Sequence, residues 1–332
     1  MSNTLFRSRI AGTGSYAPER VVTNADMEKL VETSDEWIVE RTGIKQRRYA
    51  ADGENTSDLA LQASRRALEA AGLKPSDLDM IVVGTISGDT RLPACAAYLQ
   101  KKLGCAPVPS FDVSAACAGF LYAMSIADQF VGTGACKNVL VVGVEMLSRL
   151  TNFTDRNTCV LFGDGAGAVI VQRAESPAQA GILSTKIFTD SELTESLLIP
   201  AGGTREPITA ESIAQHRDKV YMQGADIFKV AVKKLYGASQ EAIDAAGLSA
   251  DDVDWVVPHQ ANLRIITQVS QRLHVPMDRF VINIDRYGNT SSASIPLALD
   301  EAVRDGRIKP GQTVLMCALG AGISWASALV RL

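Results

Sequence analysis

Residues 113–127 and 287–299 are charge-free stretches of a length typical of a helix. A helix that is apolar on nearly every face belongs in the interior of a protein. The pattern therefore predicts two buried helices, one beginning near Cys117 and the other just after Asn289.

The sequence also repeats itself at a fixed distance. Residues 67–82 align with residues 242–257 at an offset of 175 (242 − 67 = 175), and residues 138–143 align with residues 313–318 at the same offset. Each member of the first pair reads as a helix stopped by glycine, a short acidic loop and a buried strand. Coincidental similarity of two such units is the alternative. Two segments sharing one offset favour an α/β fold built from two related halves.

The duplication places candidate chemistry between the halves. An offset of 175 takes Cys117 onto Ser292, close to Asn289, so the two buried helices would begin near one another. His259 follows the strand-like residues 255–258, and ligands in α/β proteins usually bind at such strand ends. We therefore expect a site in the middle of the molecule.

Cys117 would begin a helix, where free N–H groups and the helix dipole stabilise a thiolate. A buried cysteine is also a common small core residue. His259 alone is equally open to a structural role, whereas His216 and His274 lie in polar surroundings and are expected at the surface. For Cys117 and His259, the pattern by itself therefore leaves both a catalytic and a structural role open.

Composition narrows the class of protein. The 332 residues are 46% hydrophobic and 21% charged, as in globular proteins, and a net charge of −4 argues against a dedicated nucleic-acid binder. Residues 1–9 lack the apolar core of a signal peptide, and no apolar run approaches the roughly 18 residues of a membrane helix. The six cysteines form no Cys-x-x-Cys pair, so we expect no metal site, no disulfides and a cytoplasmic protein.

The glycine-rich residues 162–167 lack the spacing of a nucleotide-binding motif. They precede the strand-like residues 168–171 instead of opening a helix. The sequence therefore predicts a tight turn with close backbone packing there.

Taken together, these motifs resemble those of the β-ketoacyl-acyl-carrier-protein synthase III family, which starts bacterial fatty-acid synthesis. The resemblance implies a thiolase-like, five-layered αβαβα fold with an N-terminal half at 1–178 and a C-terminal half at 179–332. The motifs that carry it span essentially the whole chain: 33–43, 112–120, 162–167, 258–265, 287–294 and 320–331.

The resemblance also implies a reaction in two parts. Cys117 would take an acyl group from acyl-coenzyme A, with the backbone N–H groups of Cys117 and Ala321 stabilising the oxyanion. Malonyl-acyl-carrier protein would then lose carbon dioxide to give an enolate, which His259 and Asn289 would stabilise before carbon–carbon bond formation yields a 3-oxoacyl-carrier protein. No permanently bound cofactor is implied, and the expected partners are acyl carrier protein, acyl-coenzyme A and a second copy of the chain.

Binding residues follow by the same resemblance. The adenine of coenzyme A would stack between Trp37 and Arg156, and Arg41 would contact phosphate. Without the resemblance these residues would be read as a core aromatic and surface cations. The pantetheine tunnel would be lined by Gly224, Phe228 and Asn262.

Surface positions carry both matches and departures. Arg264 and Lys229 would face the acidic carrier protein, whereas Gln271 stands where a lysine is expected. Leu92 stands where acetyl-preferring members of the family have phenylalanine, and the resemblance implies that its loop crosses the dimer and closes the acyl pocket. Because leucine is smaller, the sequence predicts tolerance of longer or branched primers.

Three other functions compete with this one. In ester- or amide-forming relatives of secondary metabolism, His259 would act as a general base. A catalytically inactive carrier-protein-binding module is disfavoured by the complete set of Cys117, His259 and Asn289. A degradative thiolase would need a second cysteine near the C-terminus, and Cys317 lies on a predicted strand.

Overall fold

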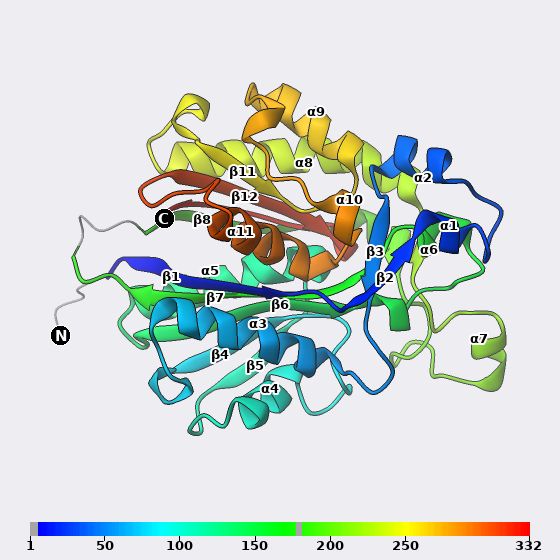
Figure 1. Ribbon diagram of the computed structural model, residues 1–332, viewed down its shortest axis with the longest axis horizontal. Helices are drawn as coiled ribbons and strands as arrows, with labels where there is room; N and C mark the ends of the chain where they lie inside the picture. The colour runs from blue at the N-terminus through cyan, green and yellow to red at the C-terminus, as the bar shows by residue number, and fades with distance from the viewer. Residues whose placement is uncertain (1–5, 177–180) are drawn as a thin grey trace.

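A computed structural model describes residues 6–176 and 181–332. Two sheets alternate with three layers of helices (Figure 1). The first sheet has the order β1-β7-β6-β4-β5 and the second the order β11-β12-β13-β8. The strands of these sheets are β1 (Ser8–Tyr16), β4 (Met80–Gly84), β5 (Ser110–Val113), β6 (Asn138–Met146), β7 (Asp164–Arg173), β8 (Ile182–Thr189), β11 (Trp255–Pro258), β12 (Thr313–Gly320) and β13 (Ser324–Arg331).

The long helices fill the outer and central layers. In Figure 1, α3 and α4 cover the outer face of the first sheet, α8 and α9 cover that of the second, and α5 and α11 lie between the sheets. Their bounds are α3 (Thr56–Ala71), α4 (Cys95–Leu103), α5 (Gly119–Gly132), α8 (Gly224–Ala245), α9 (Leu263–Leu273) and α11 (Ser294–Arg304). The order of layers is therefore αβαβα, as predicted.

Shorter elements gather at one end of the layers, on the right in Figure 1. They are β2 (Arg20–Thr23), α1 (Asn24–Met27), α2 (Asp35–Thr42), β3 (Gln46–Tyr49), α6 (Arg156–Cys159), β9 (Leu197–Leu198), α7 (Ala210–Ala214), β10 (Tyr221–Met222) and α10 (Ile284–Tyr287). Single 3₁₀ turns connect several elements, and three of them matter for the site: η2 (Ala116–Ala118), η7 (Ser291–Ala293) and η8 (Ala321–Ile323).

The two sheets repeat one pattern of pairing. β4 pairs in parallel with β6 and β6 antiparallel with β7, while β11 pairs in parallel with β12 and β12 antiparallel with β13. In the first sheet β5 pairs in parallel with β4. Its counterpart in the second sheet is a single parallel bridge between Phe280 and Val256 of β11. The duplicated architecture predicted from the 175-residue offset is therefore present. The expected boundary at 178/179 lies outside the described residues.

The two central helices follow the same offset residue by residue. η2 and α5 begin at Ala116 and Gly119, and η7 and α11 begin at Ser291 and Ser294, so both starts differ by 175 (291 − 116 = 294 − 119 = 175). Both helices are largely buried, as their charge-free first turns predict, although α5 continues through Asp128 and α11 through Asp300, Glu301 and Arg304.

Glycines let these helix starts approach the first sheet closely. A Cβ atom on Gly84 of β4 would lie 2.4 Å from the carbonyl carbon of Gly119, and one on Gly143 of β6 would lie 2.2 Å from the carbonyl oxygen of Ser292. No larger residue fits at either position without moving the backbone. The start of each central helix is thus held against the carboxyl ends of β4 and β6.

The glycine-rich residues 162–167 do not form the predicted turn. β7 begins at Asp164, so most of the motif is strand. The close packing was predicted correctly, because a Cβ atom on Gly167 would lie 2.6 Å from the Leu297 nitrogen. The glycines therefore serve the contact between β7 and α11, not a change of chain direction.

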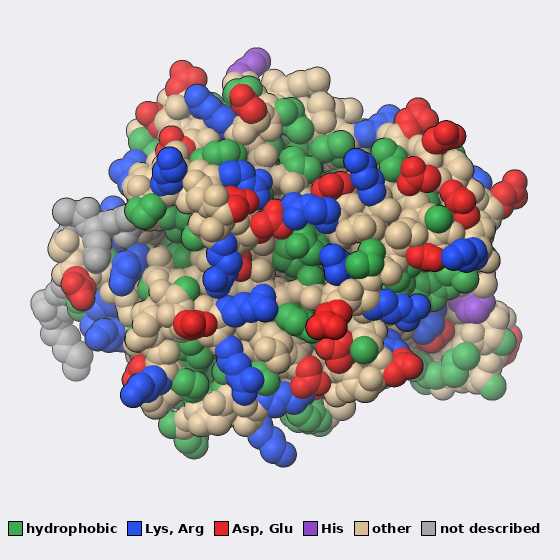
Figure 2. Space-filling view, in the orientation of Figure 1, with side chains coloured by type: hydrophobic (Ala, Val, Ile, Leu, Met, Phe, Trp, Pro, Cys, Tyr) green, Lys and Arg blue, Asp and Glu red, His purple; other side chains and the backbone are tan. Residues whose placement is uncertain are grey.

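The surface carries a mixture of charges. On the face shown in Figure 2, basic and acidic side chains are interspersed over both sheets and their covering helices. Across residues 6–176 and 181–332, no helix combines the length and hydrophobicity needed to cross a membrane.

Candidate active site

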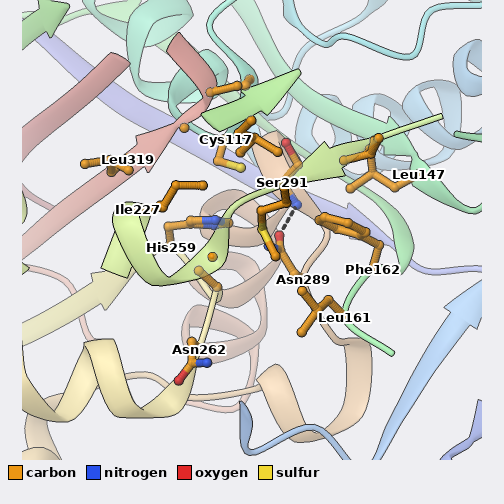
Figure 3. A pocket seen from close by; sticks show the side chains of 18 of the residues that line it. Cys117, Leu147, Leu161, Phe162, Ile227, His259, Asn262, Asn289, Ser291 and Leu319 are labelled. Carbon is orange, nitrogen blue, oxygen red and sulfur yellow. Dashed lines mark hydrogen bonds between the residues drawn. The ribbon is translucent and has the colours of Figure 1, made fainter. Parts of the chain in front are cut away.

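A cavity of about 360 Å³ lies where the two halves meet. Its walls are mainly apolar, and Cys117, His259, Asn289 and Ser291 bring polar groups to it (Figure 3). Cys117 comes from η2 in the first half, whereas His259 and Asn289 come from loops of the second half. The structure therefore brings together the three residues that the sequence selected.

Cys117 sits in η2, one turn ahead of α5. Burial raises the pKa of its thiol to about 12, and a hydrogen bond with the Ser291 side chain only partly offsets that effect. Loss of hydration therefore favours the protonated thiol and opposes the thiolate expected from the helix start.

His259 follows β11 directly and is buried. Its Nδ1 lies 2.7 Å from the Ser294 hydroxyl oxygen, which also accepts a 3.4 Å hydrogen bond from the Gln260 backbone N–H. The Ser294 hydroxyl can donate to Nδ1, and the tautomer that accepts this hydrogen bond carries the ring proton on Nε2. Burial lowers the pKa of His259 to about 3, so the ring is neutral at physiological pH.

Asn289 is held from both sides. Its backbone N–H donates to the Leu161 carbonyl at 2.8 Å, and its side-chain Oδ1 accepts a 2.8 Å hydrogen bond from the Ser291 backbone N–H (Figure 3). Since the carboxamide oxygen is engaged, the Nδ2 amino group is the donor left for a ligand. The site thus presents two neutral donors, from an imidazole and a carboxamide.

Ala321 also lines the cavity, at the start of η8. The preceding Gly320 approaches η2 so closely that a Cβ atom on it would lie 2.6 Å from the Cys117 nitrogen. Glycine at this position allows the backbone of residues 320–321 to lie beside that of Cys117. Two backbone segments from opposite halves therefore meet next to the sulfur.

Three further predicted residues, Gly224, Phe228 and Asn262, line the same cavity. The Asn262 side chain caps α9 by accepting a 2.9 Å hydrogen bond from the Arg264 N–H, and its Nδ2 donates to the Arg41 carbonyl at 2.9 Å. This hydrogen bond links the edge of the cavity to α2.

Trp37 lies on α2 between two guanidinium groups. The Cζ atoms of Arg41 and Arg156 each lie 4.8 Å from its ring centre. Arg156 also donates a 3.0 Å hydrogen bond to the Glu32 carbonyl. The predicted slot between Trp37 and Arg156 is closed, because the two groups contact one another directly.

The remaining predicted residues lie outside the cavity. Leu92 is 87% exposed and does not line the cavity of its own chain. Lys229 pairs with Asp226 at 3.0 Å, and the Arg264 guanidinium lies 5.8 Å from the Phe228 ring centre. Arg264 therefore lies next to a residue that lines the cavity, whereas the Leu92 side chain is exposed to solvent.

Sequence reasoning missed three groups that orient the site: Ser291, Ser294 and Glu145. Both serines stand within the motif at 287–294, but nothing in their spacing says what they contact. Glu145 had a signal in the sequence, since it is the one charged residue in β6, and the structure shows that it is fully buried.

Comparison with known proteins agrees with this geometry. Residues 111–191 match the family model of 3-oxoacyl-[acyl-carrier-protein] synthase III, and residues 243–332 match the model of its C-terminal part. The chain is 52% identical to β-ketoacyl-[acyl-carrier-protein] synthase III of Methylococcus capsulatus, covering 98% of each chain. It is 50% identical to the protein of that name from Caldanaerobacter subterraneus, covering 97% of each.

Solved structures give the same result. The 3-oxoacyl-[acyl-carrier-protein] synthase III of Aquifex aeolicus superposes with a TM-score of 0.90 at 43% identity, covering 98% of this chain and all of the other. The priming β-ketosynthase of the R1128 polyketide pathway superposes with a TM-score of 0.92 at 37% identity, covering 100% and 98%. The fold is therefore the thiolase fold, and the chain belongs to the β-ketoacyl-[acyl-carrier-protein] synthase III family of condensing enzymes.

Proposed function

We propose that this protein carries out the initiating condensation of fatty-acid or related polyketide synthesis. Cys117 accepts an acyl group from acyl-coenzyme A, and a malonyl group on acyl carrier protein then condenses with it to give a 3-oxoacyl-carrier protein. The family membership and the apolar cavity ending at a cysteine support this assignment.

In the first half-reaction the Cys117 sulfur attacks the thioester carbonyl. The tetrahedral intermediate carries an oxyanion, which needs fixed donors beside the sulfur. The backbones of Cys117 and Ala321 supply these N–H groups, since the close approach of Gly320 brings the two segments together. The apolar walls exclude water that would hydrolyse the acyl-enzyme.

In the second half-reaction the malonyl thioester loses carbon dioxide, and negative charge develops on its thioester oxygen. His259 Nε2–H and Asn289 Nδ2–H stabilise that enolate oxygen. The observation that carries this role is their fixed orientation: Ser294 holds Nδ1 of the imidazole, and the Ser291 N–H holds Oδ1 of the amide. Only donors are left to face the substrate, so the site suits an anion that forms during the reaction.

An ester- or amide-forming acyl transfer would instead use His259 as a general base. That role requires an unprotonated Nε2 and a pKa near neutrality. The Ser294 contact occupies Nδ1 and fits the tautomer with its proton on Nε2, and burial lowers the pKa of His259 to about 3. Condensation is therefore the better fit to this site.

The partners follow from the same geometry. Acyl-coenzyme A would enter past Asn262, with its adenine opening the contact between Trp37 and Arg156. Arg264 stands at the entrance as a contact for acyl carrier protein. The exposed Leu92 side chain would close the acyl pocket of a second copy in a homodimer.

Malonyl decarboxylation without condensation tests the second half-reaction directly. Cys117→Gln places an uncharged amide where the acyl thioester would lie, so this variant should release carbon dioxide from malonyl-acyl-carrier protein. Adding His259→Ala or Asn289→Ala should lower that rate about 10²–10³-fold each, the usual cost of a missing oxyanion donor. Undiminished decarboxylation in both double variants would contradict the proposed roles.

A further inference from the structure

Glu145 is a carboxylate that the proposed reaction leaves without a role. It lies on β6 and is fully buried. Its oxygens accept hydrogen bonds from the Thr85 hydroxyl at 3.2 Å, from the Ile86 backbone N–H at 3.2 and 3.3 Å, and from the Ser87 hydroxyl. The fourth donor is the Ser291 hydroxyl, whose oxygen lies 3.2 Å from Oε1 of Glu145. This last contact points toward the cavity.

Within residues 6–176 and 181–332, no lysine, arginine or histidine forms an ion pair with Glu145. The titratable groups that interact with it electrostatically are the thiols of Cys117 in η2 and Cys95 in α4. Burial raises the pKa of Glu145 to about 7, despite the hydrogen bonds that favour its ionised form.

Ser291 connects this carboxylate to the reacting sulfur. Its hydroxyl contacts Glu145 Oε1, and as a polar neighbour of the sulfur it partly offsets the rise that burial causes in the pKa of the Cys117 thiol. In Figure 3 the Ser291 side chain lies beside Cys117 at the wall of the cavity. Ser291 adopts a φ of 48°, a conformation that L residues rarely hold. The local fold therefore keeps a hydroxyl between a thiol and a carboxylate in an unfavourable backbone conformation.

The Cys117 thiol needs such a partner. Because the free protein holds a protonated thiol, attack on a thioester requires a proton acceptor. His259 is a poor acceptor, since its Nδ1 is engaged by Ser294 and burial lowers the pKa of the ring to about 3. Among the groups at this site, with pKa values of about 12 for Cys117 and about 3 for His259, Glu145 is the one that titrates near neutrality.

We propose that Glu145 stores the Cys117 proton while the acyl-enzyme exists, with Ser291 as the relay. This inference rests on the proposed function. As Cys117 attacks the thioester, its S–H bond breaks and the proton passes to the Ser291 oxygen. The Ser291 hydroxyl proton passes in the same step to Glu145 Oε1. The sulfur forms a bond to the acyl carbon, and the departing coenzyme A thiolate takes a proton from water.

Condensation reverses the transfer. When the malonyl-derived carbanion attacks the acyl carbon, the bond between that carbon and the Cys117 sulfur breaks and the sulfur leaves as a thiolate. Glu145 then returns the stored proton through Ser291, which restores the thiol and the carboxylate. The full cycle consumes one proton, the one taken up by coenzyme A, so the balance closes.

Glu145→Gln tests the proposal, because glutamine keeps the shape and cannot store a proton. The measurement is the single-turnover rate of Cys117 acylation by acyl-coenzyme A, followed by mass spectrometry from mildly acidic to mildly alkaline pH. The unsubstituted protein should show a rate that rises with Glu145 ionisation and levels off above a pKa of about 7. In the variant this rise of the rate with pH, the pH step, should be absent. Its acylation at neutral pH should be about 10²–10⁴-fold slower, the usual contribution of general acid–base catalysis.

Asp164→Asn is the matched control. Asp164 is another buried carboxylate, on the neighbouring strand β7, and its partners are Ser148 and the Ala50 N–H. This variant should retain the pH step. If Glu145→Gln slows acylation equally at every pH and keeps the step, Glu145 is only structural and the proposal is wrong.

Ser291→Ala keeps the test decisive if Glu145→Gln does not fold. It removes the relay and leaves the carboxylate, so it should lose the same pH step, and the double variant should be no slower than either single one. A Ser291→Ala profile like that of the unsubstituted protein would overturn the proposal. Absence of acylation in the unsubstituted protein would instead contradict the proposed function itself.

Discussion

The Ser294 hydroxyl lies 2.7 Å from Nδ1 of His259 and thereby decides which ring nitrogen faces the substrate. His259 belongs to the loop after β11 and Ser294 to the first turn of α11, so the contact joins two elements that are distant in sequence. The proposed enolate donor is therefore created by a residue that never touches the substrate.

Ser294→Ala should reduce malonyl decarboxylation about tenfold, because an oriented hydrogen bond contributes ~1–2 kcal/mol. Acylation of Cys117 should be unchanged, since His259 takes no part in it. The measurement is carbon dioxide release in the Cys117→Gln background. Ser327→Ala is the control, because it removes another buried hydroxyl, one that bonds the Ala238 carbonyl. Equal losses in both variants would contradict the orienting role.

Gly320→Ala should impair acylation and stability together. Its Cβ atom would lie 2.6 Å from the Cys117 nitrogen and push apart the two backbones that form the oxyanion site. Gly237→Ala is the matched control within α8, where a new Cβ atom meets nothing within 4 Å. The control should gain about 0.5–1 kcal/mol of unfolding free energy. Chemical denaturation and acylation rates check both, and a fully active Gly320→Ala protein would be inconsistent with the proposed site.

Stability should depend on pH through Glu145. Its pKa rises from 4.5 to about 7 on folding, so the unfolded chain ionises first as the pH increases. The unsubstituted protein should therefore lose stability relative to Glu145→Gln as pH rises from 4.5 to 7, by up to about 3 kcal/mol. Above pH 7 the difference should stay constant. Urea denaturation at several pH values measures this difference in unfolding free energy. A difference independent of pH would show that the pKa of Glu145 is not raised on folding.

Primer choice should follow Leu92. Leucine leaves more room than phenylalanine, so butyryl- to octanoyl-coenzyme A should acylate Cys117 at rates within about tenfold of acetyl-coenzyme A. Leu92→Phe should shift the preference toward acetyl by about the same factor. Competition between primers, read by mass spectrometry, gives both values. A preference for acetyl of more than about tenfold in the unsubstituted protein would refute this prediction.

Much of this fold can be predicted from the sequence because the internal duplication is visible in the sequence. The offset of 175 residues predicted two buried helices with matching starts, and the structure places Ala116 and Ser291 at equivalent points with φ values of 45° and 48°. The same reasoning made Cys117, His259 and Asn289 candidates, since each follows a strand or lies near the start of a buried helix, and the family resemblance then implied their roles.

The protonation states were not readable in this way. A helix start favours a thiolate, but burial of the Cys117 sulfur is a property of the assembled halves and has the opposite effect. The contacts of Ser291 with Glu145 span 146 residues, and no local pattern encodes them. The closed contact between Trp37 and Arg156 likewise depends on how α2 and α6 pack.

Acylation of a single sulfur is the central claim, and peptide mass spectrometry after exposure to acyl-coenzyme A tests it most directly. We predict one added acyl group on the peptide that contains Cys117, removed again when malonyl-acyl-carrier protein is supplied. Finding no stable adduct there, or finding it on another of the six cysteines, would contradict the account.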